Sequence, residues 1–181
     1  MHEIELKAKV PHASVKPEFE VNSIESRGFQ HQIDCYFNHP SKDFGDTDEA
    51  LRLRKVLLNE QSSKSVLTYK GPRLATSTKS RPETEVLVED YDALVAIFDA
   101  LEFTPVATVE KERIIYQYQN CLICLDDVVG LGEFVEIEAQ DSFSSVTEAE
   151  AAVQSVREAL GIDESAITQQ SYLEMLLHHD A

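Results

Sequence analysis

The segment Glu3-Ile4-Glu5-Leu6-Lys7, close to the start of the sequence, decides the predicted fold. Side chains of a β-strand alternate between its two faces, so the charged Glu3, Glu5 and Lys7 share one face. The isoleucine and the leucine between them take the other face. A charged strand face is ordinary where it meets water. We expect this one to line the inside of a polar tunnel instead, because the same pattern recurs along the chain.

Five later segments also place polar or charged side chains at alternate positions of a predicted strand. They are Arg52-Leu53-Arg54, Thr68-Tyr69-Lys70, Glu83-Thr84-Glu85, Lys111-Glu112-Arg113 and Glu136-Ile137-Glu138. One such strand is explained by a solvated face. Six of them in 181 residues, with both signs of charge present, predict a shared charged interior.

The composition indicates one globular domain over residues 1–181. The formal net charge of −17 argues against a surface for nucleic acids or anionic membranes. The basic residues gather in predicted strands, which indicates one local anionic ligand. We find no apolar run of about 18 residues and no signal-peptide pattern, so we expect a cytoplasmic protein without a membrane span.

The three cysteines are too few for a disulfide framework. Cys121 and Cys124 have the CxxC spacing of zinc and redox sites, but they lie in a predicted strand and no second pair exists. We expect them to be buried apolar residues, with a zinc or redox role as the alternative.

The pattern predicts an α+β fold, an eight-stranded and mainly antiparallel closed β-barrel with flanking helices. A sheet with one charged face should curl, and closing it puts the charges inside and leaves the apolar face for the helices. A Ser/Thr-rich loop at 74–80 is a candidate lid. We expect strands at 3–7, 30–38, 50–58, 64–70, 83–88, 105–118, 121–128 and 133–139, and helices within 11–28 and at 90–101, 145–160 and 166–178.

The charged segments occur in the order found in a known family. In this sequence the ordered motifs are Glu3-x-Glu5-x-Lys7, Arg52-x-Arg54, Lys70-Gly71-Pro72, Arg81-x-Glu83-x-Glu85, Glu110-Lys111-x-Arg113, Asp126, Gly130-Leu131-Gly132-x-Phe134-x-Glu136-Ile137 and Ser171-Tyr172-Leu173-x-x-Leu176-Leu177. This set resembles the CYTH superfamily of triphosphate tunnel enzymes over nearly the whole chain. Within the superfamily it most resembles the bacterial class IV adenylyl cyclases.

The resemblance implies a divalent cation, Mg²⁺ or Mn²⁺, which prefers oxygen ligands. The candidate ligands are Glu3, Glu5, Asp126, Glu136 and, on the same face, Glu138. Two further carboxylates, Glu83 and Glu85, are candidates for a second metal or for orienting basic residues, with salt bridging as the alternative.

The resemblance also implies a triphosphate held by basic side chains. Arginine binds phosphate oxygens through a planar fork and lysine acts as a point charge. The candidates are Lys7, Arg52, Arg54, Lys70, Arg81, Lys111 and Arg113. The alternative is that these residues only pair with the carboxylates of the tunnel. The expected catalytic residues are Glu5, Lys111, Arg113 and Glu136.

The leading functional prediction is conversion of ATP to 3′,5′-cyclic AMP and pyrophosphate. The first alternative is a triphosphatase for inorganic triphosphate, thiamine triphosphate or nucleotides, in which the same tunnel directs water at the terminal phosphorus. The others are a non-catalytic module that binds triphosphates or polyphosphate, and a structural barrel without a ligand. A homodimer is expected from the resemblance, and neither a nucleic acid nor a membrane is expected as a partner.

Overall fold

The computed structural model describes residues 4–59, 62–72, 82–140 and 143–179. The elements of this part of the chain are β1 (Glu5–Ala8), α1 (His12–Val21), β2 (Glu25–Asn38), β3 (Ala50–Asn59), β4 (Ser62–Lys70), β5 (Glu83–Val88), α2 (Tyr91–Ala100), β6 (Thr104–Tyr118), β7 (Cys121–Val128), β8 (Gly132–Ala139), α3 (Val146–Ala159), a 3₁₀ turn η1 (Glu164–Ala166) and α4 (Tyr172–His179). The predicted α+β class with eight strands is confirmed. The expected lid at 74–80 lies outside the described residues.

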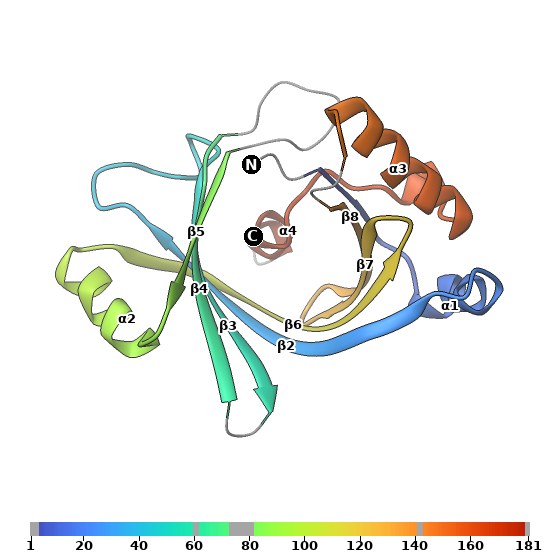
Figure 1. Cartoon of the computed structure of the whole chain (residues 1–181). Helices are drawn as coiled ribbons and strands as arrows, with labels where there is room; N and C mark the ends of the chain where they lie inside the picture. The colour runs from blue at the N-terminus through green and yellow to red at the C-terminus, as the bar shows by residue number, and fades with distance from the viewer. Residues whose placement is uncertain (1–3, 60–61, 73–81, 141–142, 180–181) are drawn as a thin grey trace.

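All eight strands form one sheet in the order β1-β8-β7-β6-β2-β3-β4-β5, and every neighbouring pair is antiparallel. The sheet curls around helix α4, as Figure 1 shows. Hairpin connections and one charged face therefore produced the expected curvature.

The predicted closure of the barrel is not confirmed, because within the described residues the strands form a curved sheet that hydrogen bonds do not close. The strands β1 and β5 are the two ends of the strand order, and no pairing within the described residues joins them. One reason is that the outer edge of β1 is already used. The backbone N–H of Lys9 donates to the carbonyl of Ala166, and the N–H of Thr168 donates to the carbonyl of Lys7, both at 2.9 Å.

The same contacts correct the helix expected at 166–178. The 3₁₀ turn η1 ends at Ala166, and Ile167 then forms an isolated antiparallel bridge with Ala8 of β1. Helix α4 begins only at Tyr172. The segment that the pattern assigned to one helix is therefore an edge segment followed by a short helix.

The apolar face of the β1, β8 and β7 part of the sheet is covered by α1 and α3 (Figure 1). Leu6, Ile137 and Ile123 come from the strands, and Phe19 of α1 and Val156 of α3 pack with them in one buried cluster. Ser145 caps α3, because its side chain accepts a hydrogen bond from the N–H of Glu148. These helices stabilise the strands that carry Lys7, Asp126 and Glu136 on their other face.

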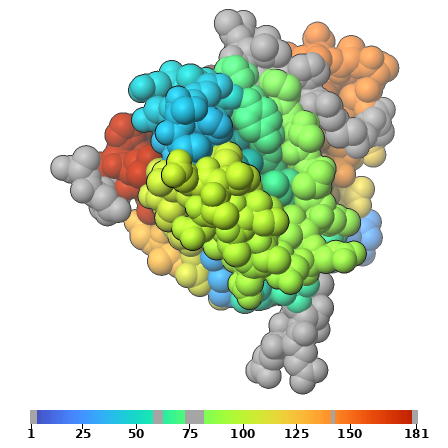
Figure 2. All heavy atoms as spheres, turned by 90° about the vertical axis from the view of Figure 1, so that its left-hand side faces the viewer, coloured from blue at the N-terminus to red at the C-terminus, as the bar shows by residue number. Residues whose placement is uncertain are grey.

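The other part of the sheet is covered by α2, which faces the viewer in Figure 2. Phe98 of α2 packs edge-on against Phe37 of β2, with ring centroids 5.0 Å apart. Leu51 and Leu53 of β3 complete the buried cluster. The Asp90 side chain accepts from the N–H of Ala93 and starts the helix where the sequence predicts.

Helix α4 lies on the concave side, at the centre of the curled sheet in Figure 1. Tyr172 packs with Val109, Val128 and Phe134 of the sheet, and its ring meets that of Phe134 edge-on at 5.0 Å. No helix within the described residues is long and apolar enough to cross a membrane.

The expectation that Cys121 and Cys124 are buried is confirmed. They lie three positions apart in β7, so their side chains point to opposite faces of the strand. All three cysteines are free, and burial raises the pKa of Cys121 to about 11 and that of Cys124 to about 12. This arrangement does not favour the zinc or redox alternative.

Candidate functional site

The concave face of the sheet carries charged side chains in directly opposed pairs. The strand register sets these pairs, since residues of one face alternate with residues of the other. Opposite charges face each other at Lys7 and Glu136, Arg113 and Asp126, Arg54 and Asp34, and Lys70 and Glu83. The predicted sharing of one face by alternate residues therefore produces a continuous polar surface.

Asp126 of β7 is the centre of the first group, which we call the aspartate cluster and which comprises Lys7, Lys111, Arg113, Asp126, Glu136 and Tyr172. Arg113 donates two hydrogen bonds to the carboxylate, both at 2.6 Å. Lys111 donates at 2.8 Å and the hydroxyl of Tyr172 at 2.9 Å. The side chain of Asp126 is completely buried, so these donors replace water around it.

Glu136 of β8 extends the aspartate cluster to the edge strand. It accepts a hydrogen bond from Arg113 and lies 3.2 Å from the ammonium group of Lys7. The ring of Tyr172 lies under two cations, with its centroid 4.0 Å from Nζ of Lys7 and 4.8 Å from Nζ of Lys111. One aromatic ring from α4 thus connects β1 with β6.

The electrostatics of the aspartate cluster keep its carboxylates ionised. Burial alone would raise the pKa of Asp126, but the guanidinium of Arg113 and the ammonium of Lys111 outweigh it and lower that pKa. Burial acts on Glu136 in the same way, and Arg113, Lys111 and Lys7 bring its pKa well below the ordinary value. Burial and the neighbouring Arg113 charge lower the pKa of Lys111.

The second group, which we call the arginine cluster, comprises Asp34, Arg52, Arg54, Thr68 and Glu85. Arg54 donates to both oxygens of Asp34, at 2.6 and 2.7 Å. Burial opposes ionisation of Asp34, but the Arg54 charge outweighs it and lowers the pKa of this carboxyl to about 2. This is the bidentate geometry that makes arginine–carboxylate pairs strong.

The outer part of the arginine cluster is a short chain of hydrogen bonds. Arg52 donates to the hydroxyl of Thr68 at 3.0 Å, and this hydroxyl donates to Glu85 at 2.7 Å. Further along β4 and β5, Lys70 of β4 pairs with Glu83 of β5. Glu83 and Glu85 are thus engaged in ion pairs or hydrogen bonds with basic side chains and Thr68, as in the salt-bridging alternative for these residues.

The two clusters lie close enough to influence each other. Lys111 contributes to lowering the pKa of Asp34, and Arg54 contributes to lowering the pKa of Lys111. The structure therefore brings the predicted residues Lys7, Arg52, Arg54, Lys111, Arg113, Asp126 and Glu136 together on one concave surface.

The remaining predicted residues are less central or lie elsewhere. Glu5 and Glu138 oppose each other at the edge of the same face, and both are partly exposed. Glu3 and Arg81 lie outside the described residues. Asp127, next to Asp126, is exposed on the other side of β7.

Asp34, Tyr172 and Gln32 lie on this surface but are not among the site residues predicted from the sequence. Tyr172 belongs to a motif of the family resemblance, but its position under Lys7 and Lys111 depends on where α4 packs. Gln32 is a buried neutral residue of β2 opposite Lys111. No charge alternation marks it, so only the register identifies it.

The donor chemistry of this face suits a hard divalent cation only in part. Its carboxylate oxygens are the ligands that Mg²⁺ and Mn²⁺ prefer. The described residues hold no group of three or more His, Cys, Asp or Glu side chains placed to bind a metal. The oxygens of Asp126 are also occupied by four hydrogen bonds. One or two of Glu5, Glu136 and Glu138 fit better, as carboxylates that share a cation with substrate phosphates.

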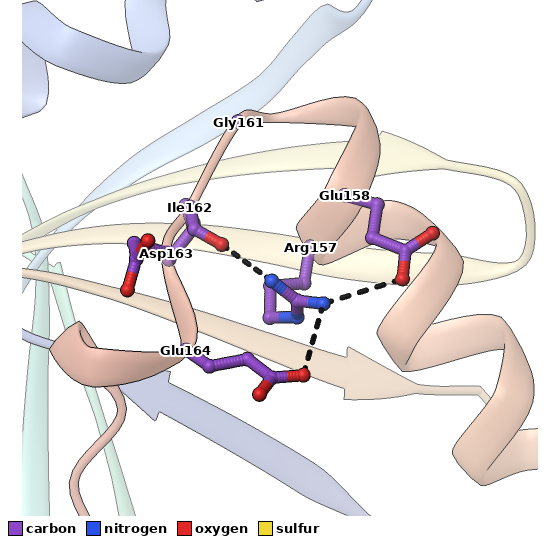
Figure 3. A pocket seen from close by; sticks show the side chains of 6 residues that line it. All are labelled: Arg157, Glu158, Gly161, Ile162, Asp163 and Glu164. Atoms are coloured by element: carbon purple, nitrogen blue, oxygen red, sulfur yellow. Dashed lines mark hydrogen bonds and ion pairs between the residues drawn. The ribbon is translucent and has the colours of Figure 1, made fainter.

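A pocket of about 520 Å³ lies away from the charged clusters, where the chain leaves α3 (Figure 3). The guanidinium of Arg157 donates to the carbonyl of Ile162 at 2.6 Å and lies 3.3 Å from Glu158 and 3.7 Å from Glu164. These bonds fix the turn after α3. The acidic surroundings of Arg157 do not suit a phosphate.

Comparison with known proteins gives the family. The family model described as the CYTH domain matches residues 1–172. A Methanocaldococcus jannaschii protein named "Putative adenylate cyclase MJ0240" is 35% identical over 183 residues, which cover 97% of this chain and 98% of the relative. The protein with its curved sheet and paired interior charges therefore belongs to the CYTH family.

Solved structures agree with this assignment. The PH1819 protein of Pyrococcus horikoshii OT3 has a TM-score of 0.85 and 34% identity, with 98% of this chain and 99% of that chain covered. A Hippeastrum protein, HpAC1, described as a "putative adenylyl cyclase" with a dominant triphosphatase activity, has a TM-score of 0.71 and 18% identity over 99% and 96% of the two chains. At that identity the second likeness supports the fold alone.

The buried Asp34 predicts a specific dependence of stability on pH. Its pKa in the folded protein is about 2, below the 3.8 of an unperturbed carboxyl. The ionised group therefore stabilises the fold above pH 4, and this contribution is lost as the pH falls toward 2. We expect Asp34→Asn to lower the free energy of unfolding at neutral pH by about 2 kcal/mol, measured by urea denaturation.

The exposed Asp127→Asn is the matched control, and it should change the free energy of unfolding by no more than about 0.5 kcal/mol. Asp34→Asn should also flatten the loss of stability between pH 4 and pH 2. If the free energy of unfolding falls as steeply between pH 4 and pH 2 in Asp34→Asn as in the unmodified protein, the ion pair between Asp34 and Arg54 is contradicted.

Proposed function

We propose that the protein is a metal-dependent enzyme that acts on a triphosphate bound across the aspartate and arginine clusters. The observation that carries the proposal is the line of basic side chains on one concave surface. Within the described residues Lys111 donates a single hydrogen bond, to Asp126, and its ammonium has three donors. The remaining donors suit phosphate oxygens, which accept hydrogen bonds.

The charge balance of the concave face supports a divalent cation as part of the complex. The described carboxylates of this face are at least as numerous as its cations. The carboxylates are Glu5, Asp34, Glu83, Glu85, Asp126, Glu136 and Glu138, and the cations are Lys7, Arg52, Arg54, Lys70, Lys111 and Arg113. A triphosphate adds several negative charges, which are costly to bury without added positive charge.

We propose that the reaction is cyclisation of ATP to 3′,5′-cyclic AMP and pyrophosphate. The ribose 3′ oxygen forms a bond to the α-phosphorus, the bond from that phosphorus to the bridging oxygen of pyrophosphate breaks, and the hydroxyl proton passes to solvent. Lys111, Arg113 and Arg54 hold the phosphates in line and stabilise charge on the leaving group. Mg²⁺ or Mn²⁺ held near Glu5, Glu136 and Glu138 would lower the pKa of the attacking hydroxyl.

The second candidate is a triphosphatase, and the charged lining of paired basic and acidic side chains is compatible with it. The charged clusters hold phosphates in either reaction, and the same residues would then orient a water at the terminal phosphorus. The M. jannaschii relative carries a cyclase name and the more distant HpAC1 is described by a dominant triphosphatase activity. The two reactions differ in which phosphorus lies opposite the attacking oxygen.

Product analysis tests the proposed reaction. We expect phosphorus NMR of the protein with ATP and Mg²⁺ or Mn²⁺ to show pyrophosphate together with cyclic AMP. A parallel sample holds inorganic triphosphate. ADP and orthophosphate, or faster loss of inorganic triphosphate than of ATP, would support the triphosphatase instead. Absence of turnover in every sample would contradict an enzyme and leave a binding module.

A variant without the ammonium group of Lys111 tests the proposed binding surface. We expect Lys111→Ala to weaken triphosphate binding by about 10- to 100-fold, because hydrogen bonds to charged groups are lost from a buried site. Titration calorimetry measures this effect. Lys55→Ala is the matched control, since Lys55 lies on the other face of β3 above the ring of Tyr91. Equal affinity of the Lys111 variant and the unmodified protein would remove Lys111 from the site.

A further inference from the structure

Among the residues that the structure describes, Gln32 is the one neutral amide buried among the charges of the concave face. It lies on β2 opposite Lys111 of β6, shares its face with Asp34, and is 3% exposed. Its amide nitrogen donates to the side-chain oxygen of Gln30 at 2.6 Å. Its own oxygen, Oε1, is buried and has no hydrogen-bond partner within the described residues.

A buried acceptor without a donor is uncommon, because it has lost its hydrogen bonds to water and no protein hydrogen bond offsets that cost. The cations Lys111 and Arg54 on the two neighbouring strands favour the oxygen end of the amide, rather than its NH₂, toward the centre of the face. The concave face thus offers a ligand many hydrogen-bond donors, and it also carries one acceptor without a partner, Oε1 of Gln32.

A phosphate chain cannot satisfy this acceptor. Ionised phosphate oxygens only accept hydrogen bonds, so fully ionised inorganic triphosphate has no donor for Oε1 of Gln32. The donor has to lie beside the phosphates, because Lys111 of β6 lies opposite Gln32 and Arg54 of β3 lies diagonally from it, opposite Asp34. In a nucleoside triphosphate the group that follows the α-phosphate is the sugar, whose hydroxyls are donors, whereas the amino group of the base is farther away.

We propose that Gln32 is a specificity-determining residue whose Oε1 accepts a hydrogen bond from a sugar hydroxyl of the substrate, which makes a nucleoside triphosphate the preferred substrate over inorganic triphosphate. This inference rests on the proposed function. It assigns recognition of the sugar to Gln32, whereas the charged residues contact the phosphates. An ordered water and the remaining donors of Lys111 are the competing donors, and the experiment below separates both of them from a sugar hydroxyl.

The test is a double-mutant cycle in which one change removes the Gln32 amide and the other removes a sugar hydroxyl of the ligand. Dissociation constants of ATP, 2′-deoxy-ATP, 3′-deoxy-ATP and inorganic triphosphate are measured by titration calorimetry with Ca²⁺, for the unmodified protein and for Gln32→Met. In the unmodified protein the loss of one hydroxyl should weaken binding about tenfold. In Gln32→Met the same loss should change binding by no more than about twofold, and inorganic triphosphate should bind both proteins alike.

Gln154→Met, an exposed glutamine of α3, is the control and should leave all four constants unchanged. The deoxynucleotide comparison on the unmodified protein stands even where Gln32→Met fails to fold. Equal affinities for ATP and both deoxynucleotides, or an equal weakening of ATP and inorganic triphosphate in Gln32→Met, would overturn the role of Gln32 while the proposed function stands. No binding of any triphosphate to the unmodified protein would overturn both.

Discussion

The interaction on which the rest of the site depends is the clamp around Asp126. A fully buried carboxylate is tolerated only when charged or polar donors replace its water. Arg113 and Lys111 of β6 and Tyr172 of α4 supply these donors, and Arg113 also reaches Glu136 of β8. The clamp therefore holds three strands and the last helix in one arrangement. It also aligns the basic side chains that the proposed function requires.

The concave face combines two properties that oppose each other. Paired charges stabilise an interior that would otherwise be too polar to bury, yet they also occupy the groups that a ligand needs. The number of donors resolves this conflict, because Lys111 and Arg113 together carry more donors than the hydrogen bonds that they make to Asp126 and Glu136. Lys111 and Arg113 can hold Asp126 and still contact a phosphate. The pairing is thus compatible with binding and also positions the side chains for it.

Charge alternation in the sequence predicted which residues share the interior face, from Lys7 and Glu136 to Arg52 and Arg54. Periodicity assigns a residue to a face but carries no information on which strands become edges. The use of the β1 edge by residues around Ile167 was therefore not predicted. The long final helix was wrong, and closure of the barrel is not confirmed within the described residues. The positions of Tyr172 and Gln32 depend on packing and register, so no local pattern marked their roles.

We propose that the nearly charge-balanced interior binds a triphosphate together with a divalent cation. The most direct measurement is titration calorimetry of the unmodified protein with ATP, once in excess chelator and once in Mg²⁺. The account predicts that Mg²⁺ tightens binding by about tenfold or more, because the added positive charge offsets the buried phosphates. Equal affinity with and without the metal would contradict it.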